Sequence, residues 1–194
     1  MSQPAQAQAS GKVVVKGTLI LDYVKLIRTN PDRPWSKWLR PEDLEIVHGQ
    51  VLASGKYPFS SFSRIGFSVY KEIAQSNLET VRGFGHFFIK GMMEVYGKSV
   101  LVPGDPVTTI DKFTQLYKVW IIGGGQTSME KIADNKIAFR IVPPDEGQSE
   151  EVTRAYMHQV AGQIEELIKL SSGATCRAEV INTPKSWEFI AEWK

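Results

Sequence analysis

The chain has 194 residues, 42% of them hydrophobic, which is enough to form the core of one domain or of one domain with a small appendage. Its 23 basic and 21 acidic residues nearly cancel and are interspersed, so neither a nucleic-acid-binding surface nor an acidic disordered tract is indicated. No apolar run approaches the roughly 18–20 residues of a membrane span, and we expect no membrane insertion. The single cysteine, Cys176, excludes an intramolecular disulfide and favours a reducing cytoplasm.

The first residues, 1–15, are interpreted as a flexible N-terminal tail. Residues 1–10 are rich in Gln, Ala, Ser and Pro and lack the hydrophobic segment of a secretory signal. Residues 16–194 are expected to form a single α+β domain.

A helical N-terminal half is predicted by apolar residues that recur three and four positions apart. The expected helices cover 17–28, 41–52 with a stop at Gly55, 60–73, 78–96 and 105–121. Pro41 and Pro106 stand at first helical positions, and the second of these follows a capping aspartate, Asp105. Gly97 and the glycines at 123–125 are expected to end the fourth and fifth helices.

After residue 125 the apolar residues recur at every second position instead of every third or fourth. Segments 126–133 and 136–142 are predicted as strands joined by a hairpin at Asp134-Asn135, and 175–182 and 187–193 as a second pair of strands. A long crossover helix is expected over 149–170. These elements predict a four-stranded antiparallel sheet covered by helices. The last strand is expected at the edge of this sheet, with Glu188 and Glu192 outside to discourage further strand pairing.

The fourth helix has an unusual composition. Arg82, His86, Lys90 and Glu94 follow one another at intervals of four and form a narrow polar stripe, whereas most of the remaining surface is apolar. The helix also contains three glycines, Gly83, Gly85 and Gly91, and each costs about 1 kcal/mol relative to alanine. Three interpretations stay open: tight packing against another backbone, a cavity or ligand channel, and a dimer contact.

This pattern resembles a ligand-binding superfamily that contains the four-vinyl-reductase domains, the haem–nitric-oxide-binding domains and the vesicle-tethering TRAPP subunits. The chain is most similar to uncharacterised myxobacterial-type proteins of about 200 residues. The resemblance covers 16–194. It is carried by Lys16-Gly17, Tyr57-Pro58-Phe59, the helix 82–96, Trp120 and Gly162.

The chain also departs from these families. The haem-binding members carry an axial histidine and a Tyr-x-Ser-x-Arg clamp for the porphyrin, and no tyrosine of this chain begins that pattern. The cysteine cluster of four-vinyl-reductase domains is reduced to Cys176. The resemblance therefore implies the fold without haem or zinc, and we expect no cofactor.

Individual candidates for chemistry are few. The histidines, His48, His86 and His158, are too far apart to form a helical metal pair, and His86 is flanked by cationic residues of its own helix. Cys176 is expected to be a buried, inert thiol on an apolar strand face. Gly123 to Ser128 lacks the lysine of a phosphate-binding loop. The carboxylates are expected on solvated helix faces: Asp22, Glu42, Asp43, Glu165 and Glu166.

The sequence thus favours a non-enzymatic bacterial signalling or regulatory module that binds a small apolar ligand or a protein partner. The alternative is a structural or interaction protein that dimerises through the glycine-bearing helix and binds no ligand. The expected ligand or interface residues are Gly83, Gly85, Phe88, Gly91, Met92 and Trp120. The expected partner-binding residues are Trp35, Trp38, Tyr57 and Phe59.

Overall fold

The computed structural model describes residues 13–194, which form an α+β fold of six α-helices and two antiparallel sheets. The helices are α1 (Thr18–Arg28), α2 (Pro41–His48), α3 (Phe59–Glu72), α4 (Leu78–Val100), α5 (Pro106–Trp120) and α6 (Glu150–Ser172). The strands are β1 (Val14–Lys16), β2 (Lys56–Pro58), β3 (Ile121–Ile122), β4 (Gln126–Ala133), β5 (Lys136–Val142), β6 (Glu179–Asn182) and β7 (Trp187–Glu192). The predicted α+β class is confirmed.

The larger sheet has four antiparallel strands in the order β4-β5-β7-β6. The predicted bounds of β4 and β5 and their connection at Asp134-Asn135 are confirmed. Phe139 of β5 pairs with Met129 of β4 on one side and with Phe189 of β7 on the other. The expected edge position of the last strand is wrong, because β7 lies between β5 and β6 and its carboxylates pair with basic residues of β5.

Local capping chemistry sets the limits of the long helices. The Asp105 side chain accepts a hydrogen bond from the backbone of Thr108 at the start of α5, and Ser149 does the same for Val152 at the start of α6. Gly173 ends α6 with a φ of +76°, a left-handed conformation that glycine adopts without strain. Gly97 does not end α4, which continues to Val100.

The smaller sheet, in the order β2-β1-β3, was not predicted. Val14 and Val15, assigned to the tail, are buried in β1, and residues 1–12 lie outside the described part of the chain. Ile121-Ile122, assigned to the fifth helix, forms β3. The second helix ends at His48 rather than near Leu52. The strands of the smaller sheet have only two or three residues each, too few to show an alternation of apolar and polar side chains.

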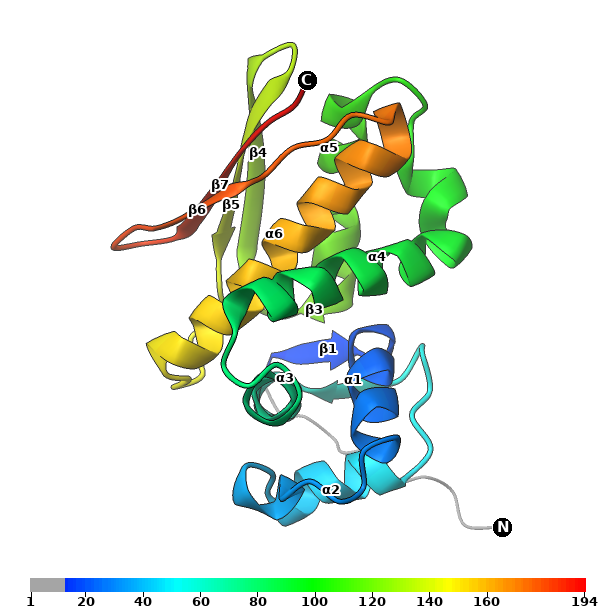
Figure 1. Ribbon diagram of the computed structural model, residues 1–194, viewed down its shortest axis with the longest axis vertical. Helices are drawn as coiled ribbons and strands as arrows, with labels where there is room; N and C mark the ends of the chain where they lie inside the picture. The colour runs from blue at the N-terminus through cyan, green and yellow to red at the C-terminus, as the bar shows by residue number, and fades with distance from the viewer. Residues whose placement is uncertain (1–12) are drawn as a thin grey trace.

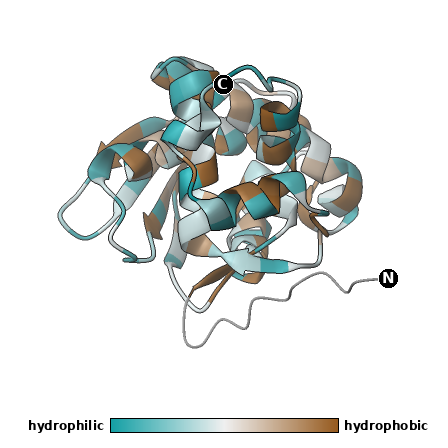
Figure 2. Cartoon of the chain, turned by 90° about the horizontal axis from the view of Figure 1, so that it is seen from below, coloured by the Kyte–Doolittle hydropathy of each residue, from teal (hydrophilic) through white to brown (hydrophobic). Residues whose placement is uncertain are grey.

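The elements form layers. The larger sheet lies against α6 and α5, and α4 packs across α6 on the side away from the sheet (Figure 1). The helices α1, α2 and α3 gather with β1 and β2 at the opposite end of the molecule from the β4–β5 hairpin (Figure 1). Brown and teal stretches stand side by side on the helices in Figure 2, as amphipathic helices require. One continuous hydrophobic core joins both ends of the molecule.

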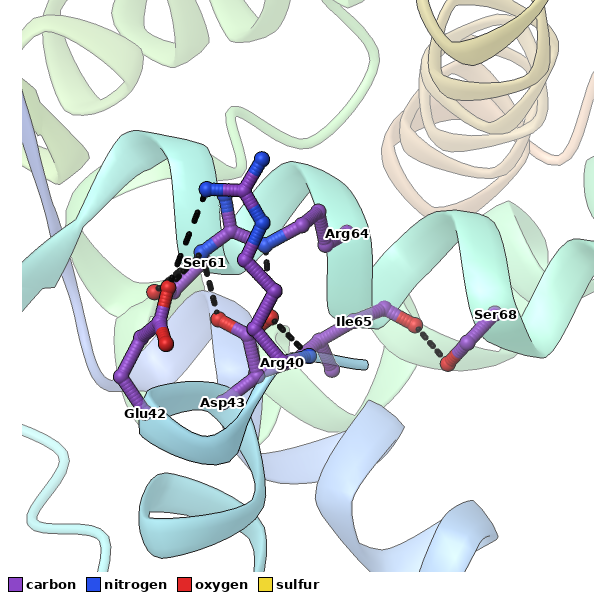
Figure 3. A network of polar contacts seen from close by, with 7 residues as sticks. All are labelled: Arg40, Glu42, Asp43, Ser61, Arg64, Ile65 and Ser68. Carbon is purple, nitrogen blue, oxygen red and sulfur yellow. Dashed lines mark hydrogen bonds and ion pairs between the residues drawn. The ribbon is translucent and has the colours of Figure 1, made fainter. Parts of the chain in front are cut away.

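A charged network joins α2 to α3 (Figure 3). The Asp43 side chain is 0% exposed and accepts two hydrogen bonds from Arg64, at 2.6 and 2.8 Å, and one from the backbone of Arg40 at 3.0 Å. Burial alone would raise the pKa of Asp43, but these hydrogen bonds outweigh it and lower the pKa. The expectation that Asp43 is solvated is therefore wrong, whereas Glu42 remains exposed.

Candidate functional site

The helices α4 and α6 cross in close contact at two glycines. A Cβ atom at Gly85 would overlap the carbonyl oxygen of Gln159 on α6, and one at Gly162 would overlap the carbonyl oxygen of Arg82 on α4. Only glycine permits such an approach of two backbones. Close packing, one of the three interpretations left open for the α4 glycines, therefore holds for Gly85.

A cluster of charges lies beside this crossing. Arg82, 5% exposed, forms an ion pair with Glu165 at 3.3 Å and donates a hydrogen bond to the carbonyl oxygen of Ala178 at 2.7 Å. Glu165 also accepts a hydrogen bond from the Ala178 backbone at 2.7 Å. The His86 ring lies between the two carboxylates, with Nε2 2.9 Å from Glu165 and Nδ1 3.1 Å from Glu166. The cluster ties α4, α6 and the segment before β6 together.

Two expectations about this cluster are wrong. Glu165 and Glu166 are buried, not solvated, and they face His86 from α6. The hydrogen bond to Glu165 and, against the opposing effect of burial, that to Glu166 raise the pKa of His86. The charge that surrounds His86 is therefore anionic and comes from another helix, whereas the sequence suggested the cationic neighbours of its own helix.

An apolar crevice lies between α3 and the first half of α6, closed on one side by α1 and on the other by α4. We call it the aromatic crevice, because seven aromatic side chains line it: Tyr23, Phe59, Phe62, Phe67, Tyr70, Phe84 and Tyr156. Its cavity volume is about 30 Å³. A single water needs about 10–15 Å³ measured in the same way, so the crevice in this state admits only a very small molecule.

Three tyrosine hydroxyls beside the crevice have hydrogen-bond partners. Tyr23 donates a hydrogen bond to the side-chain oxygen of Gln159, and the hydroxyls of Tyr117 and Tyr156 lie 2.9 Å apart. Burial raises the pKa of all three tyrosines, so each hydroxyl remains neutral at physiological pH. The hydrogen bond between Tyr117 and Tyr156 joins α5 directly to α6.

The outer face of α4 is exposed. A Cβ atom at Gly83 or Gly91 would have no atom within 4 Å, and the nearby Phe87 and Val95 are 65% and 76% exposed. Beside Gly91 runs a groove of about 250 Å³ between α1 and α4, which we call the α1–α4 groove. It is lined by Thr18, Leu21, Asp22, Ala53, Gly91, Met92, Val95 and Tyr96.

The six residues expected at a ligand site or interface are therefore dispersed. Gly83 and Gly91 face outward and Gly85 faces α6. Phe88 and Trp120 are buried in the core, where Phe88 packs edge-on against Tyr23 and Trp120 against Phe113. Gly91 and Met92 meet in the α1–α4 groove.

The four aromatic residues expected at a partner site are also separated. Trp35 is buried and donates a hydrogen bond to the Asn30 carbonyl oxygen at 2.8 Å. Phe59 is buried and lines the aromatic crevice. Trp38 and Tyr57 are half-buried. The Trp38 indole donates to Glu72 at 2.6 Å, and the Tyr57 hydroxyl accepts from the Leu52 backbone at 3.0 Å.

The remaining candidates contribute no reactive group. Burial and then the charge of Glu165 raise the pKa of Cys176 to about 12. Within residues 13–194, no three His, Cys, Asp or Glu side chains gather as a metal site requires. No helix in the same part of the chain is long and apolar enough to cross a membrane.

The chain was compared with known proteins. No protein-family model and no curated protein sequence matches it. Its structure is nevertheless similar to solved H-NOX structures. The Fe(II) unliganded H-NOX protein from K. algicida matches with a TM-score of 0.61 and 12% identity, over 92% of this chain and 96% of that chain. An S. oneidensis H-NOX protein in the Fe(II)NO ligation state matches with a TM-score of 0.62 and 14% identity, over 92% and 99%. A point mutant of T. tengcongensis H-NOX matches with a TM-score of 0.60 and 15% identity, over 92% and 97%.

These matches establish a shared fold. Of the branches named from the sequence, the haem–nitric-oxide-binding one is represented among these structures, and at 12–15% identity they show the fold alone. The four-vinyl-reductase and TRAPP resemblances and the similarity to myxobacterial-type proteins gain no support from these matches.

The residues that line the aromatic crevice do not fit a haem. Cofactor-sized sites measure about 300–1,000 Å³, whereas the aromatic crevice holds about 30 Å³ and the Tyr117–Tyr156 bond closes α5 on α6 beside it. None of the histidines lines the crevice. His48 is exposed at the end of α2, and both ring nitrogens of His86 face carboxylates.

Two features of the site escaped the sequence analysis. Gln159 and Glu165 lie on a helix whose second half is buried on nearly every side, so its polar residues are internal. The one available signal was the resemblance at Gly162, which marked the α4–α6 crossing. The aromatic crevice had no signal, because Phe62 and Tyr156 fit ordinary core periodicity.

Proposed function

We propose that the protein is a non-enzymatic bacterial signalling or regulatory module of the cytoplasm that binds a small apolar ligand in the aromatic crevice. The observation that carries this proposal is the crevice itself, whose lining is mostly apolar and includes seven aromatic side chains. Gln159 is one of its polar groups, and it is already engaged by Tyr23. Shape and apolar contact, rather than ionic recognition, would select the ligand.

The fold supports the regulatory part of the proposal. The S. oneidensis neighbour is an H-NOX protein in the Fe(II)NO ligation state, and thus a protein of this fold that carries a small ligand. In this chain the crevice takes the ligand directly, because its residues do not fit a haem. The module would then report ligand binding through the contacts of α6, which touch α3, α4 and α5.

Xenon is a suitable probe because it is a single apolar atom that enters small apolar cavities. We expect NMR shifts at Phe62, Val81 and Tyr156 on addition of xenon. Ser63→Phe should fill the crevice and abolish these shifts, whereas Ser60→Phe, on the same helix outside the crevice, should retain them. Native mass spectrometry of the purified protein would detect a retained natural ligand. The proposal would be contradicted if neither the NMR shifts nor the mass of a retained ligand were observed.

Haem binding is tested separately. Haemin mixed with the protein should give no Soret band that survives gel filtration. A Soret band that survives gel filtration, and that His86→Ala removes, would show that the protein binds haem through His86. That result would overturn the haem-free proposal.

A second candidate function is self-association through α4. It is favoured by the exposure of Phe87 and Val95 on the same face as Gly83 and Gly91.

A further inference from the structure

We infer that the outer face of α4 is a self-complementary surface that pairs antiparallel with α4 of a second copy of this chain. The inference rests on the second candidate function above and specifies its geometry. It concerns one row of residues four apart, which we call the outer ridge: Glu79, Gly83, Phe87, Gly91, Val95 and Ser99.

Size complementarity identifies the occupant. Two-fold antiparallel pairing about position 89 places Phe87 opposite Gly91 of the partner copy and Val95 opposite its Gly83. Each exposed apolar side chain then meets a glycine that has nothing within 4 Å of its Cβ position. Parallel pairing in register would instead place Phe87 against Phe87 and leave the glycines facing one another.

The α1–α4 groove supplies the space. Gly91 lies in this groove of about 250 Å³, with Val95 and Leu21 in its walls. The Phe87 ring of a second copy, placed over Gly91, would enter it. A large side chain that enters a hole in the opposing helix is the ordinary form of tight helix packing.

The crossing angle limits the contact to the middle of the ridge. Rows of residues four apart pack with helix axes crossing at about −50°, the commonest class in globular proteins. Glu79 is already paired with Arg177 of its own chain, and it lies with Ser99 at the ends of the ridge, away from the contact. Phe87 and Gly91 therefore carry the pairing.

The size of the contact predicts a weak dimer. A pairing confined to one helix and an adjacent groove falls in the class below about 1,200 Å², which is typical of transient complexes. Dissociation constants in the micromolar range are therefore expected. Sedimentation velocity from about 5 to 500 µM covers this range.

The first experiment compares wild type with Gly91→Leu, Phe87→Ser and a matched control. Gly91→Leu should abolish the dimer and leave the urea midpoint unchanged or higher, because the new side chain enters open space in the monomer. Phe87→Ser should also abolish it. Val119→Ser, which removes another exposed apolar residue, on α5 (Val119 is 57% exposed), should leave the dimer intact. A monomer at every concentration would overturn self-association itself, and a dimer unaffected by Gly91→Leu would overturn this surface.

The second experiment tests the register. Phe87→Cys and Gly91→Cys are oxidised separately and as an equimolar mixture. The mixture should give more disulfide-linked dimer than either variant alone, because only the mixed pair places the two sulfurs opposite one another. A higher yield from Phe87→Cys alone would show parallel pairing and overturn the antiparallel register. Neither result bears on ligand binding in the aromatic crevice, so the two proposals fail independently.

Discussion

The inner and outer faces of α4 carry the same residue, glycine, in opposite surroundings. On the inner face Gly85 lies against the backbone of α6, where no side chain fits. On the outer face Gly83 and Gly91 meet no atom of the chain. Glycines that lie two to six residues apart on the same helix therefore have different structural roles. The inner one permits a helix crossing, and the outer ones leave space that a partner is able to fill.

The largest expected effect concerns the charges that support the inner face. Arg82→Met should lower the free energy of unfolding by about 3–5 kcal/mol, because it leaves the buried Glu165 with only His86 as a cationic partner. Arg177→Met is the matched control, since it breaks the exposed pair with Glu79 and should cost at most about 1 kcal/mol. Urea unfolding of both variants measures the difference. Equal costs would show that the buried pair contributes no more than a surface pair.

The next effect tests the inner glycine directly. Gly85→Leu should lower the free energy of unfolding by about 1–3 kcal/mol or more, because the side chain overlaps the Gln159 carbonyl and forces α4 away from α6. The measurement is the urea midpoint, with slope checked for a change in cooperativity. A midpoint equal to that of wild type would mean that Gly85 faces free space in solution.

The outer glycine should respond in the opposite direction. Gly83→Ala should raise the free energy of unfolding by about 0.4–1 kcal/mol, because alanine restricts the unfolded chain and meets no atom in the folded one. The measurement is made at low micromolar concentration, where the monomer dominates. If Gly83→Ala instead lowers the free energy of unfolding, the outer glycine behaves like the inner one, and the contrast between the two faces of α4 is wrong.

The smallest effect is a dependence on pH. Because hydrogen bonds to Glu165 and Glu166 raise the pKa of His86 above its unfolded value, protonated His86 stabilises the fold. This stability is fully present below pH about 6.5 and is lost as the pH rises through the folded pKa. His86→Gln should remove that decline from a plot of urea midpoint against pH between about 5 and 9. A wild-type plot as flat as that of the variant would contradict the assigned contacts.

Local pattern was sufficient for much of the fold. The alternation in β4 and β5 predicted both strands, and the cap at Asp105 marked the start of α5. In each case the signal lies within a few residues of the structure it predicts. By contrast, β1 has three residues and acquires its structure from partners about 40 and 100 residues away.

The site was less predictable for the same reason. The sequence neighbours of His86 are Arg82 and Lys90, and they indicated a cationic environment. Its actual partners, Glu165 and Glu166, are about 80 residues away and become neighbours only when α4 crosses α6. The sequence of one helix therefore predicts which of its faces are polar and which are apolar. The charge that surrounds a polar face also depends on the helix that packs against it.

The raised pKa of Cys176 has a practical consequence for labelling chemistry. Burial raises the pKa of this thiol to about 12, so less of it is ionised at pH 7 than of an exposed cysteine, and only the thiolate reacts quickly with maleimides or iodoacetamide. Cys176 is also the only cysteine in the sequence. A cysteine introduced on an exposed helix face would therefore take a fluorophore or spin label almost alone. Distances between labelled sites become measurable in an otherwise native chain, with no need to replace its own thiol.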